Sequence, residues 1–306
     1  MNKILVTGAT GIVGSRVVRD LQGRGVSVRA FVRDTGKAAN LLGDSIELAS
    51  GDFANAASMR DALQGVDRVF LASANHPRQV EYEIGVIEAA REAGVRRIVK
   101  LSALGAEIGS PVAFWDWHGQ IERHLQASDV HAVVLRPSFN MTNLLGSAEQ
   151  IKYAGSLFVP AAGARIAMID PTDVAAVAAV ALTEDGHDGK IYTLTGPEAI
   201  TFEHVAAQFS DILNQPIQFV TVPDEAAQHA LVESGMPEFV AGQIVAVFGL
   251  LRRGVQDYTT DAVHTIIGRP PHTFAHFVHE YADVFRSPQA PRSVDTDRAK
   301  VTGATL

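Results

Sequence analysis

Three glycines near the start of the chain have the spacing of a phosphate-binding turn. The segment KILVTGATGIVGSRVV places Gly8, Gly11 and Gly14 between a short apolar run and a helical pattern. Such glycines let the chain turn, let backbone N–H groups approach a diphosphate, and let the helix pack on the strand. A helix N-terminus also favours an anion. We therefore expect a dinucleotide along this turn, at Gly8, Thr10, Gly11, Ile12, Val13 and Gly14.

The end of the second predicted strand, VSVRAFV, bears on which dinucleotide binds. About 20 residues beyond the turn, an acidic side chain would bind the ribose hydroxyls of NAD, whereas a cation would bind the 2′-phosphate of NADP. Arg33, with Lys37 in support, therefore favours NADP(H) over NAD(H). Asp34 keeps the second option open, because a strand one residue longer would bring its carboxylate to the ribose. Its alternative role is that of a helix cap.

Short β-rich runs alternate with helical patterns through residues 1–150, which predicts crossover connections and a parallel sheet. Return elements are expected at about residues 165–196, and residues 197–286 have the pattern of a smaller lobe. Residues 287–306 lack periodic apolar positions and are expected to be a mobile tail. We thus predict an α/β fold: a Rossmann-type doubly wound parallel sheet with a smaller, mostly helical C-terminal substrate lobe.

Composition excludes several classes of function. The chain has 306 residues, of which 47% are hydrophobic, and a formal net charge of −8. Nucleic acid is therefore not an expected partner, because phosphate binding needs clustered cations. No run approaches the roughly 20 apolar residues that span a bilayer, and MNKILVTG is too short for a signal peptide, so we expect a cytoplasmic protein with no membrane partner. Cysteine is absent, which excludes disulfides and thiolate chemistry.

Several motifs together resemble those of a known family. They are the glycine turn, GDF at 51–53, LASA at 71–74, SALGA at 102–106 and LRPSFNMTNLL at 135–145. This set resembles the NmrA-like branch of the atypical short-chain dehydrogenases/reductases, within it the quinone-reductase and triphenylmethane-reductase types. The likeness runs from residue 1 to about residue 285 and implies a nicotinamide cofactor.

The resemblance also implies where that cofactor makes its remaining contacts. An acidic residue and a phenylalanine flank the adenine in such proteins, small residues line the two riboses, and a proline borders the nicotinamide. On this chain these expected contacts are Asp52, Phe53, Ala72, Ser73, Ala74 and Pro137.

The usual proton donor of short-chain reductases is missing from this chain. Such enzymes protonate the developing alkoxide with a Tyr that is followed by a Lys four residues later, on the same helical face. None of the five Tyr here has a Lys at that spacing. Aligned with the family through Glu122, the Lys position falls on His118 and the Tyr position on Phe114. An acceptor that delocalises charge, such as a quinone or an aryl cation, could still take a hydride directly.

Two residues are candidates for catalysis. His118 could hydrogen-bond an acceptor oxygen, deliver a proton, or bind the cofactor ribose as the family Lys would. Ser102 matches a position where the superfamily keeps a Ser or Thr that polarises a carbonyl, although a strand-end hydroxyl can also cap a loop. A flat substrate pocket over the nicotinamide is expected to be lined by Asn75, Phe114, Trp117, Phe139 and Asn140.

These observations favour an NADPH-dependent oxidoreductase that transfers a hydride directly to a small aromatic, quinone-like or other planar conjugated acceptor. One alternative is a non-catalytic, redox-sensing regulator that binds NAD(P) and docks on a partner protein. Another is a pathway-specific ketone or enone reductase. The apolar run at residues 239–251 either covers the active cleft or forms a subunit contact, as in a homodimer. No metal is expected at His272, His276 and His279, because no suitably spaced carboxylate completes the set.

Overall fold

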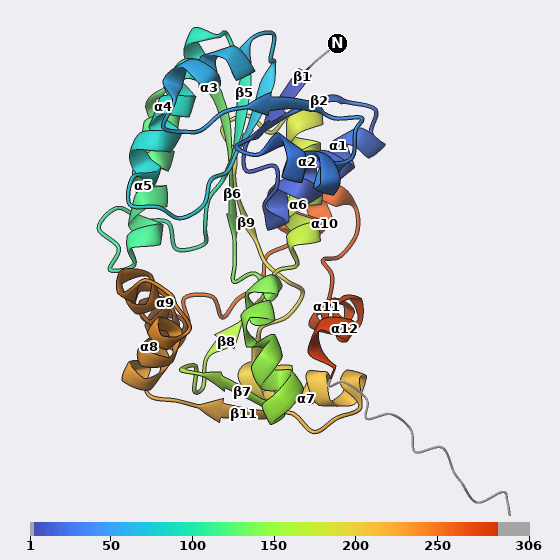
Figure 1. Ribbon diagram of the computed structural model, residues 1–306, viewed down its shortest axis with the longest axis vertical. Helices are drawn as coiled ribbons and strands as arrows, with labels where there is room; N and C mark the ends of the chain where they lie inside the picture. Colours follow the sequence, from blue (N-terminus) through green and yellow to red (C-terminus); the bar gives the residue numbers. More distant parts are fainter. Residues whose placement is uncertain (1–2, 287–306) are drawn as a thin grey trace, which may run out of the picture.

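A seven-stranded, wholly parallel sheet forms the centre of the protein (Figure 1). The computed structural model describes residues 3–286, so the predicted tail lies outside the described part. The strand order is β3-β2-β1-β4-β5-β6-β9. The strands are β1 Lys3–Val6, β2 Ser27–Val32, β3 Glu47–Ser50, β4 Arg68–Leu71, β5 Arg97–Leu101, β6 His131–Pro137 and β9 Ile191–Leu194. This arrangement confirms the predicted Rossmann-type, doubly wound α/β fold.

Helices cover both faces of the sheet, which is why its strands are apolar almost throughout. Within β5, Ile98 packs into the core on one face and Val99 into the core on the other. The first face carries α3 Ala56–Leu63, α4 Gln79–Glu92 and α5 Ala113–Ala127; the second carries α1 Ile12–Gly23, α2 Thr35–Leu42, α6 Pro171–Thr183 and α10 Ala262–Ile267.

Helix α6 packs beside α1 on the same face of the sheet, over β4, β5 and β6, and its sequence explains its start. Asp170 is the N-cap residue, and its side chain accepts a hydrogen bond from the Thr172 N–H. Pro171 occupies the first helical position, and Asp173 lies in the first turn. The rest of the helix is Ala and Val on every side, as a fully buried helix requires.

A separate apolar core holds the smaller lobe together. The lobe contains a parallel strand pair, β7 with β11, and an antiparallel pair, β8 with β10. Its elements are η1 Met141–Ser147, η2 Gln150–Ala154, β7 Ser156–Val159, β8 Arg165–Ile166, β10 Ile200–Thr201, α7 Phe202–Leu213, β11 Gln218–Thr221, α8 Asp224–Glu233, α9 Glu238–Leu251, α11 Phe274–Glu280 and α12 Ala282–Phe285.

The division between the two cores differs from simple sequence ranges. Met141 and Leu144 already pack into the core of the smaller lobe, before residue 150. Helix α10 in turn packs on α6 and β9 of the sheet domain, although it lies within residues 197–286. The chain thus passes more than once between the two cores, and segments that are close in sequence can pack in different lobes. Among the described residues, no helix combines the length and apolar character needed to cross a bilayer.

Candidate active site

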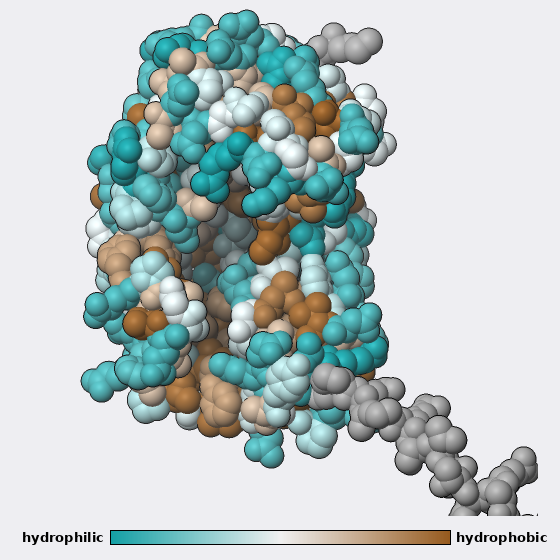
Figure 2. All heavy atoms as spheres, viewed as in Figure 1, coloured by the Kyte–Doolittle hydropathy of each residue, from teal (hydrophilic) through white to brown (hydrophobic). Residues whose placement is uncertain are grey.

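The candidate site is a hollow at the carboxyl ends of the strands. The strand order reverses between β1 and β4, and ligands of open α/β sheets bind outside the strand ends at such a reversal. Figure 2 shows a deep hollow in the face drawn there, between the sheet domain above and the smaller lobe below. The sequence-predicted residues on the glycine turn and at the ends of β4, β5 and β6 converge on this part of the fold.

The glycine turn has the geometry that its spacing predicts. Gly8 has a φ of +59°, and a Cβ there would lie 2.9 Å from the Ala72 carbonyl oxygen. A Cβ at Gly14 would lie 2.1 Å from the Gly8 oxygen, so only glycine lets α1 start this close to the turn. No side chain caps α1 at Gly11, and the first turn holds no acidic residue. The free N–H groups at this helix end could hold a diphosphate.

The residues expected to select the cofactor lie on the exposed end of β2 and the start of α2. Asp34 is the N-cap of α2, where its carboxylate accepts a hydrogen bond from the Lys37 N–H at 3.0 Å. Arg33 is exposed and makes no ion pair or hydrogen bond within the part of the chain that the structure describes. The Lys37 side chain is 85% exposed, with its Nζ 3.9 Å from Asp34. Arg33 and Lys37 are exposed cations, and the Asp34 carboxylate beside them is already engaged as the cap of α2. This arrangement fits a phosphate group better than a ribose hydroxyl.

Aromatic side chains surround the position expected for the adenine. The Phe53 ring meets Phe31 edge-on at 5.9 Å and lies 6.5 Å from the Tyr82 ring. Asp52 accepts a hydrogen bond from the Ala54 N–H, which fixes the turn that carries Phe53. The Thr7 hydroxyl donates to the Ala72 carbonyl at 2.9 Å, and this ties the end of β4 to β1. Ser73 turns its hydroxyl toward α4, while Ala74 and Asn75 are exposed.

His118 belongs to a buried polar network that sequence reasoning missed. Its Nδ1 lies 3.2 Å from the Nζ of Lys100 on β5, and Lys100 forms a 2.8 Å ion pair with Glu83 of α4. Lys100 also donates to the Leu101 carbonyl, and Glu83 accepts hydrogen bonds from Ser73 at 2.7 Å. Lys100 and Glu83 are fully buried, and His118 is 9% exposed.

The surroundings of His118 determine its protonation. Burial and, secondarily, the neighbouring Lys100 charge hold the pKa of His118 well below its usual range, so the ring is neutral near pH 7. An ammonium group can only donate hydrogen bonds, so Nδ1 accepts from Lys100 and the ring proton sits on Nε2. His118 is therefore a neutral donor through Nε2.

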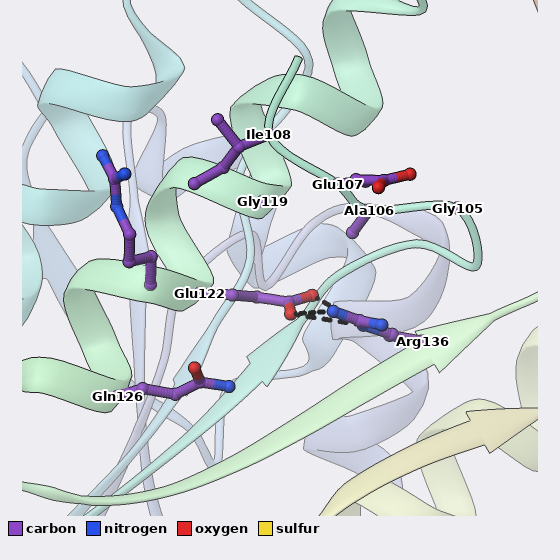
Figure 3. A pocket seen from close by; sticks show the side chains of 9 residues that line it. Gly105, Ala106, Glu107, Ile108, Gly119, Glu122, Gln126 and Arg136 are labelled. Carbon is purple, nitrogen blue, oxygen red and sulfur yellow. Dashed lines mark hydrogen bonds and ion pairs between the residues drawn. The ribbon is translucent and has the colours of Figure 1, made fainter. Parts of the chain in front are cut away.

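Ser102, at the end of β5, is engaged by a second charged group. Its hydroxyl donates to Glu122 of α5, which also forms an ion pair with Arg136 of β6, with a 3.1 Å Nε–Oε1 contact. This hydrogen bond raises the pKa of the Arg136 guanidinium above its usual value. Figure 3 shows the Glu122 and Arg136 side chains in direct contact in the lining of a polar pocket of about 490 Å³. The pocket is lined by Gly105, Ala106, Glu107, Ile108, Gly119, Glu122, Arg123, Gln126 and Arg136, and not by the glycine turn.

The predicted aromatic pocket forms only in part. Trp117 stacks on Phe239 of α9 at 6.2 Å, and Phe114 meets Trp117 edge-on at 5.6 Å. Phe139 packs instead against Phe248, 6.0 Å away on the same helix α9. Helix α9 therefore supplies a ring partner to both Trp117 and Phe139.

The remaining residues around the predicted pocket have structural contacts of their own. Asn140 caps η1, because its side-chain Oδ1 accepts hydrogen bonds from both the N–H and the hydroxyl of Thr142. Trp115 is a core residue, and its ring fills the space beside Gly105, where a Cβ would lie 2.6 Å away. Of the two tryptophans, Trp115 is buried and Trp117 is partly exposed.

Comparison with known proteins shows the family of the chain. The model of the NmrA-like family matches residues 1–269. The chain belongs to the NmrA-like family. An NAD(P)H azoreductase of Xenophilus azovorans is 36% identical over 282 residues, which cover 92% of this chain and 99% of that protein. The resemblance stated from the sequence motifs is thereby confirmed.

Two solved structures of NmrA-like reductases have the same fold as this protein. The NADPH-dependent quinone oxidoreductase of Escherichia coli, solved with NADPH, has a TM-score of 0.84 at 29% identity, covering 91% of this chain and 99% of the other. The triphenylmethane reductase of Citrobacter sp., solved with NADP(H), has a TM-score of 0.80 at 26% identity, covering 91% and 99%. Likeness to the quinone- and dye-reductase types is therefore confirmed as well.

Proposed function

We propose that this protein is an NADPH-dependent reductase that passes a hydride directly from the nicotinamide to a planar conjugated acceptor, such as a quinone. That the chain is an NAD(P)H-dependent oxidoreductase of the quinone- or dye-reductase type follows from its family and its relatives. The observation that carries the finer proposal is the neutral, buried His118 at the position of the usual Lys, in a chain without a Tyr-Lys pair.

Cofactor binding in this proposal uses the elements that already have the right geometry. The uncapped N-terminus of α1 binds the diphosphate, and Phe53 with its aromatic neighbours faces the adenine. Arg33 and Lys37 bind the 2′-phosphate of NADP(H), because Asp34 is engaged as the cap of α2. Pro137 at the end of β6 borders the nicotinamide. NADP(H) is thus the cofactor, and NAD(H) is expected to bind more weakly.

The chemistry needs little from the protein beyond position and one hydrogen bond. Hydride transfer oxidises NADPH to NADP⁺ and converts a quinone to a hydroquinone monoanion, whose charge is spread over the ring. His118 Nε2–H is the donor that stabilises the developing oxyanion, and Lys100 behind it fixes this tautomer. The monoanion then takes one proton from water, because the other hydroxyl hydrogen comes from the hydride. A simple ketone would instead leave a localised alkoxide, and the chain has no Tyr followed by a Lys four residues later to protonate it.

The first experiment measures NADPH oxidation by the purified protein across quinones, triarylmethane and azo dyes, and simple ketones, with NADH in parallel. Turnover confined to flat conjugated acceptors supports the proposal. Turnover of simple ketones would indicate the ketone-reductase alternative. Tight NADPH binding with no turnover on any acceptor would indicate the regulatory alternative.

A variant of His118 tests the assigned donor. His118→Ala should lower kcat/KM by about 10- to 100-fold, since a hydrogen bond to a charged group contributes about 1.5–3 kcal/mol. NADPH affinity should change little. The matched control is His124→Ala, one turn and a half further along α5, where the ring contacts Glu88 at the surface. If His118→Ala turned over conjugated acceptors as fast as His124→Ala, the site assignment would be wrong.

A further inference from the structure

A carboxylate and two imidazoles meet where the smaller lobe contacts the start of α6. Asp170, His272 and His276 each bring one ligand atom within 4.8 Å of the others. The two histidine rings stack with their centroids 4.2 Å apart. The sequence pattern predicted no metal here because it offered no carboxylate; Asp170, far earlier in the chain, supplies one. His279 is not part of the cluster.

We propose that Asp170, His272 and His276 bind a divalent transition-metal cation, Zn²⁺ in the first instance. The strongest reason is an unpaired buried oxygen. Asp170 is 1% exposed, and its Oδ1 accepts the Thr172 N–H at 2.7 Å as the cap of α6. Its Oδ2 makes no hydrogen bond within the part of the chain that the structure describes. A buried carboxylate oxygen without a partner is costly, and a cation would supply that partner.

The neighbouring charges are those of a metal site with a supporting carboxylate. Asp173 is fully buried; its Oδ2 accepts the His272 N–H at 2.7 Å, and its Oδ1 lies 2.8 Å from His272 Nδ1. Asp173 thus places a carboxylate beside the His272 ring, where outer carboxylates lie at many metal-binding histidines, and both Asp173 Oδ1 and His272 Nδ1 are buried without a hydrogen bond among the described residues. Arg269 neutralises part of this charge, with its Nη1 2.8 Å from Asp173 Oδ1. The carboxylates of Asp170 and Asp173 and the single guanidinium of Arg269 together carry a net negative charge, which favours binding of a cation.

The ligand set and its geometry favour zinc. Two imidazoles and one carboxylate, with room for water, form a common zinc site, with bonds of about 2.0–2.2 Å. Such bonds place tetrahedral ligand atoms about 3.3 Å apart, so the cluster must contract slightly around the ion. His276 is exposed, so its side chain is the ligand with the most freedom to turn toward the ion. The bound ion would join α11 of the smaller lobe to α6 of the sheet domain.

The test uses the full-length protein without an affinity tag, first stripped with a chelator. Calorimetric titration with ZnCl₂ should show one site, and ZnCl₂ should raise the thermal midpoint, whereas MgCl₂ should do neither. His276→Ala should weaken zinc binding at least tenfold. His279→Ala is the matched control on the same helix, and it should bind as the wild type does.

A second variant separates the metal ligand from the helix cap. Asp170→Asn keeps an oxygen that can cap α6 but removes the anionic ligand, so metal-free stability should change little while zinc affinity falls at least tenfold. The proposal would be overturned by a wild type that binds no zinc. It would equally be overturned by His276→Ala and Asp170→Asn both binding zinc like His279→Ala. Neither outcome depends on reductase activity.

Discussion

Lys100 and Glu83 place two opposite charges under the candidate site, both fully buried. Removing one charge would leave the other unpaired in the interior. Glu83→Gln should therefore lower the free energy of unfolding by about 3–5 kcal/mol, measured by urea denaturation. Glu81→Gln is the matched control, because Glu81 lies on the same helix and pairs with Arg78 at the surface. Equal effects of the two substitutions would contradict the burial of this pair.

His118 makes stability depend on pH in a definite direction. Burial, and then the Lys100 charge, lowers the pKa of folded His118 well below the unfolded value of 6.5. Below pH 6.5 the unfolded chain therefore binds a proton that the folded chain does not. The contribution of His118 to the free energy of unfolding is complete above pH 6.5 and falls by up to about 1.4 kcal/mol per pH unit below it.

His118→Gln should accordingly flatten the loss of stability between pH 6.5 and 5, measured as urea midpoints. His131→Gln, at an exposed position on β6, should leave that slope unchanged. A wild-type slope that survives in His118→Gln would show that other groups cause the acid sensitivity.

At the scale of elements, the fit of α1 on the glycine turn is the most demanding contact of the cofactor site. Gly14→Ala would push a Cβ to 2.1 Å from the Gly8 oxygen, and backbone on both sides leaves little room to relax. We expect a loss of about 1–3 kcal/mol in unfolding free energy together with weaker NADPH binding. Gly23→Ala, at the far end of α1, meets nothing within 4 Å and should be neutral or stabilising. Normal cofactor binding by Gly14→Ala would refute this role.

Local sequence patterns predicted the strands, helices and turns well. They predicted poorly which residues far apart in the sequence contact each other. The glycine turn and the cap at Asp170 were predictable because all their parts lie within a few residues. Lys100 and Glu83 were not, because a Lys at the end of a strand and a Glu on a helix are ordinarily surface residues. Only the packing of α4 and α5 on β5 turns them inward. Asp170 and His272 likewise lie far apart in the sequence and come together only in the fold, so no sequence spacing predicts their contact.

At the scale of the whole molecule, the proposed cofactor site lies at the carboxyl ends of the strands of the central sheet, so NADPH should stabilise the fold built on that sheet. A ligand that binds only the folded chain adds about 2.7 kcal/mol at 100 times its Kd. We expect NADPH to raise the thermal midpoint clearly and NADH, at the same concentration, to raise it less. Arg33→Ala should abolish the difference between the two cofactors, and equal shifts in the wild type would argue against a 2′-phosphate site at Arg33.

The repeated passage of the chain between the two cores limits how such a protein can acquire new substrates. Leu251, Val263 and Phe274 lie in turn in the core of the smaller lobe, the core of the sheet domain and the core of the smaller lobe, so no single excision removes the smaller lobe intact. The hairpin of α8 and α9 is different, because α8 buries no residue and α9 presents Phe239 and Phe248 to Trp117 and Phe139, two residues of the predicted substrate pocket. The α8–α9 hairpin is therefore the segment to exchange or randomise when a new acceptor is wanted. Among homologues, differences in acceptor preference should go with sequence differences in this hairpin.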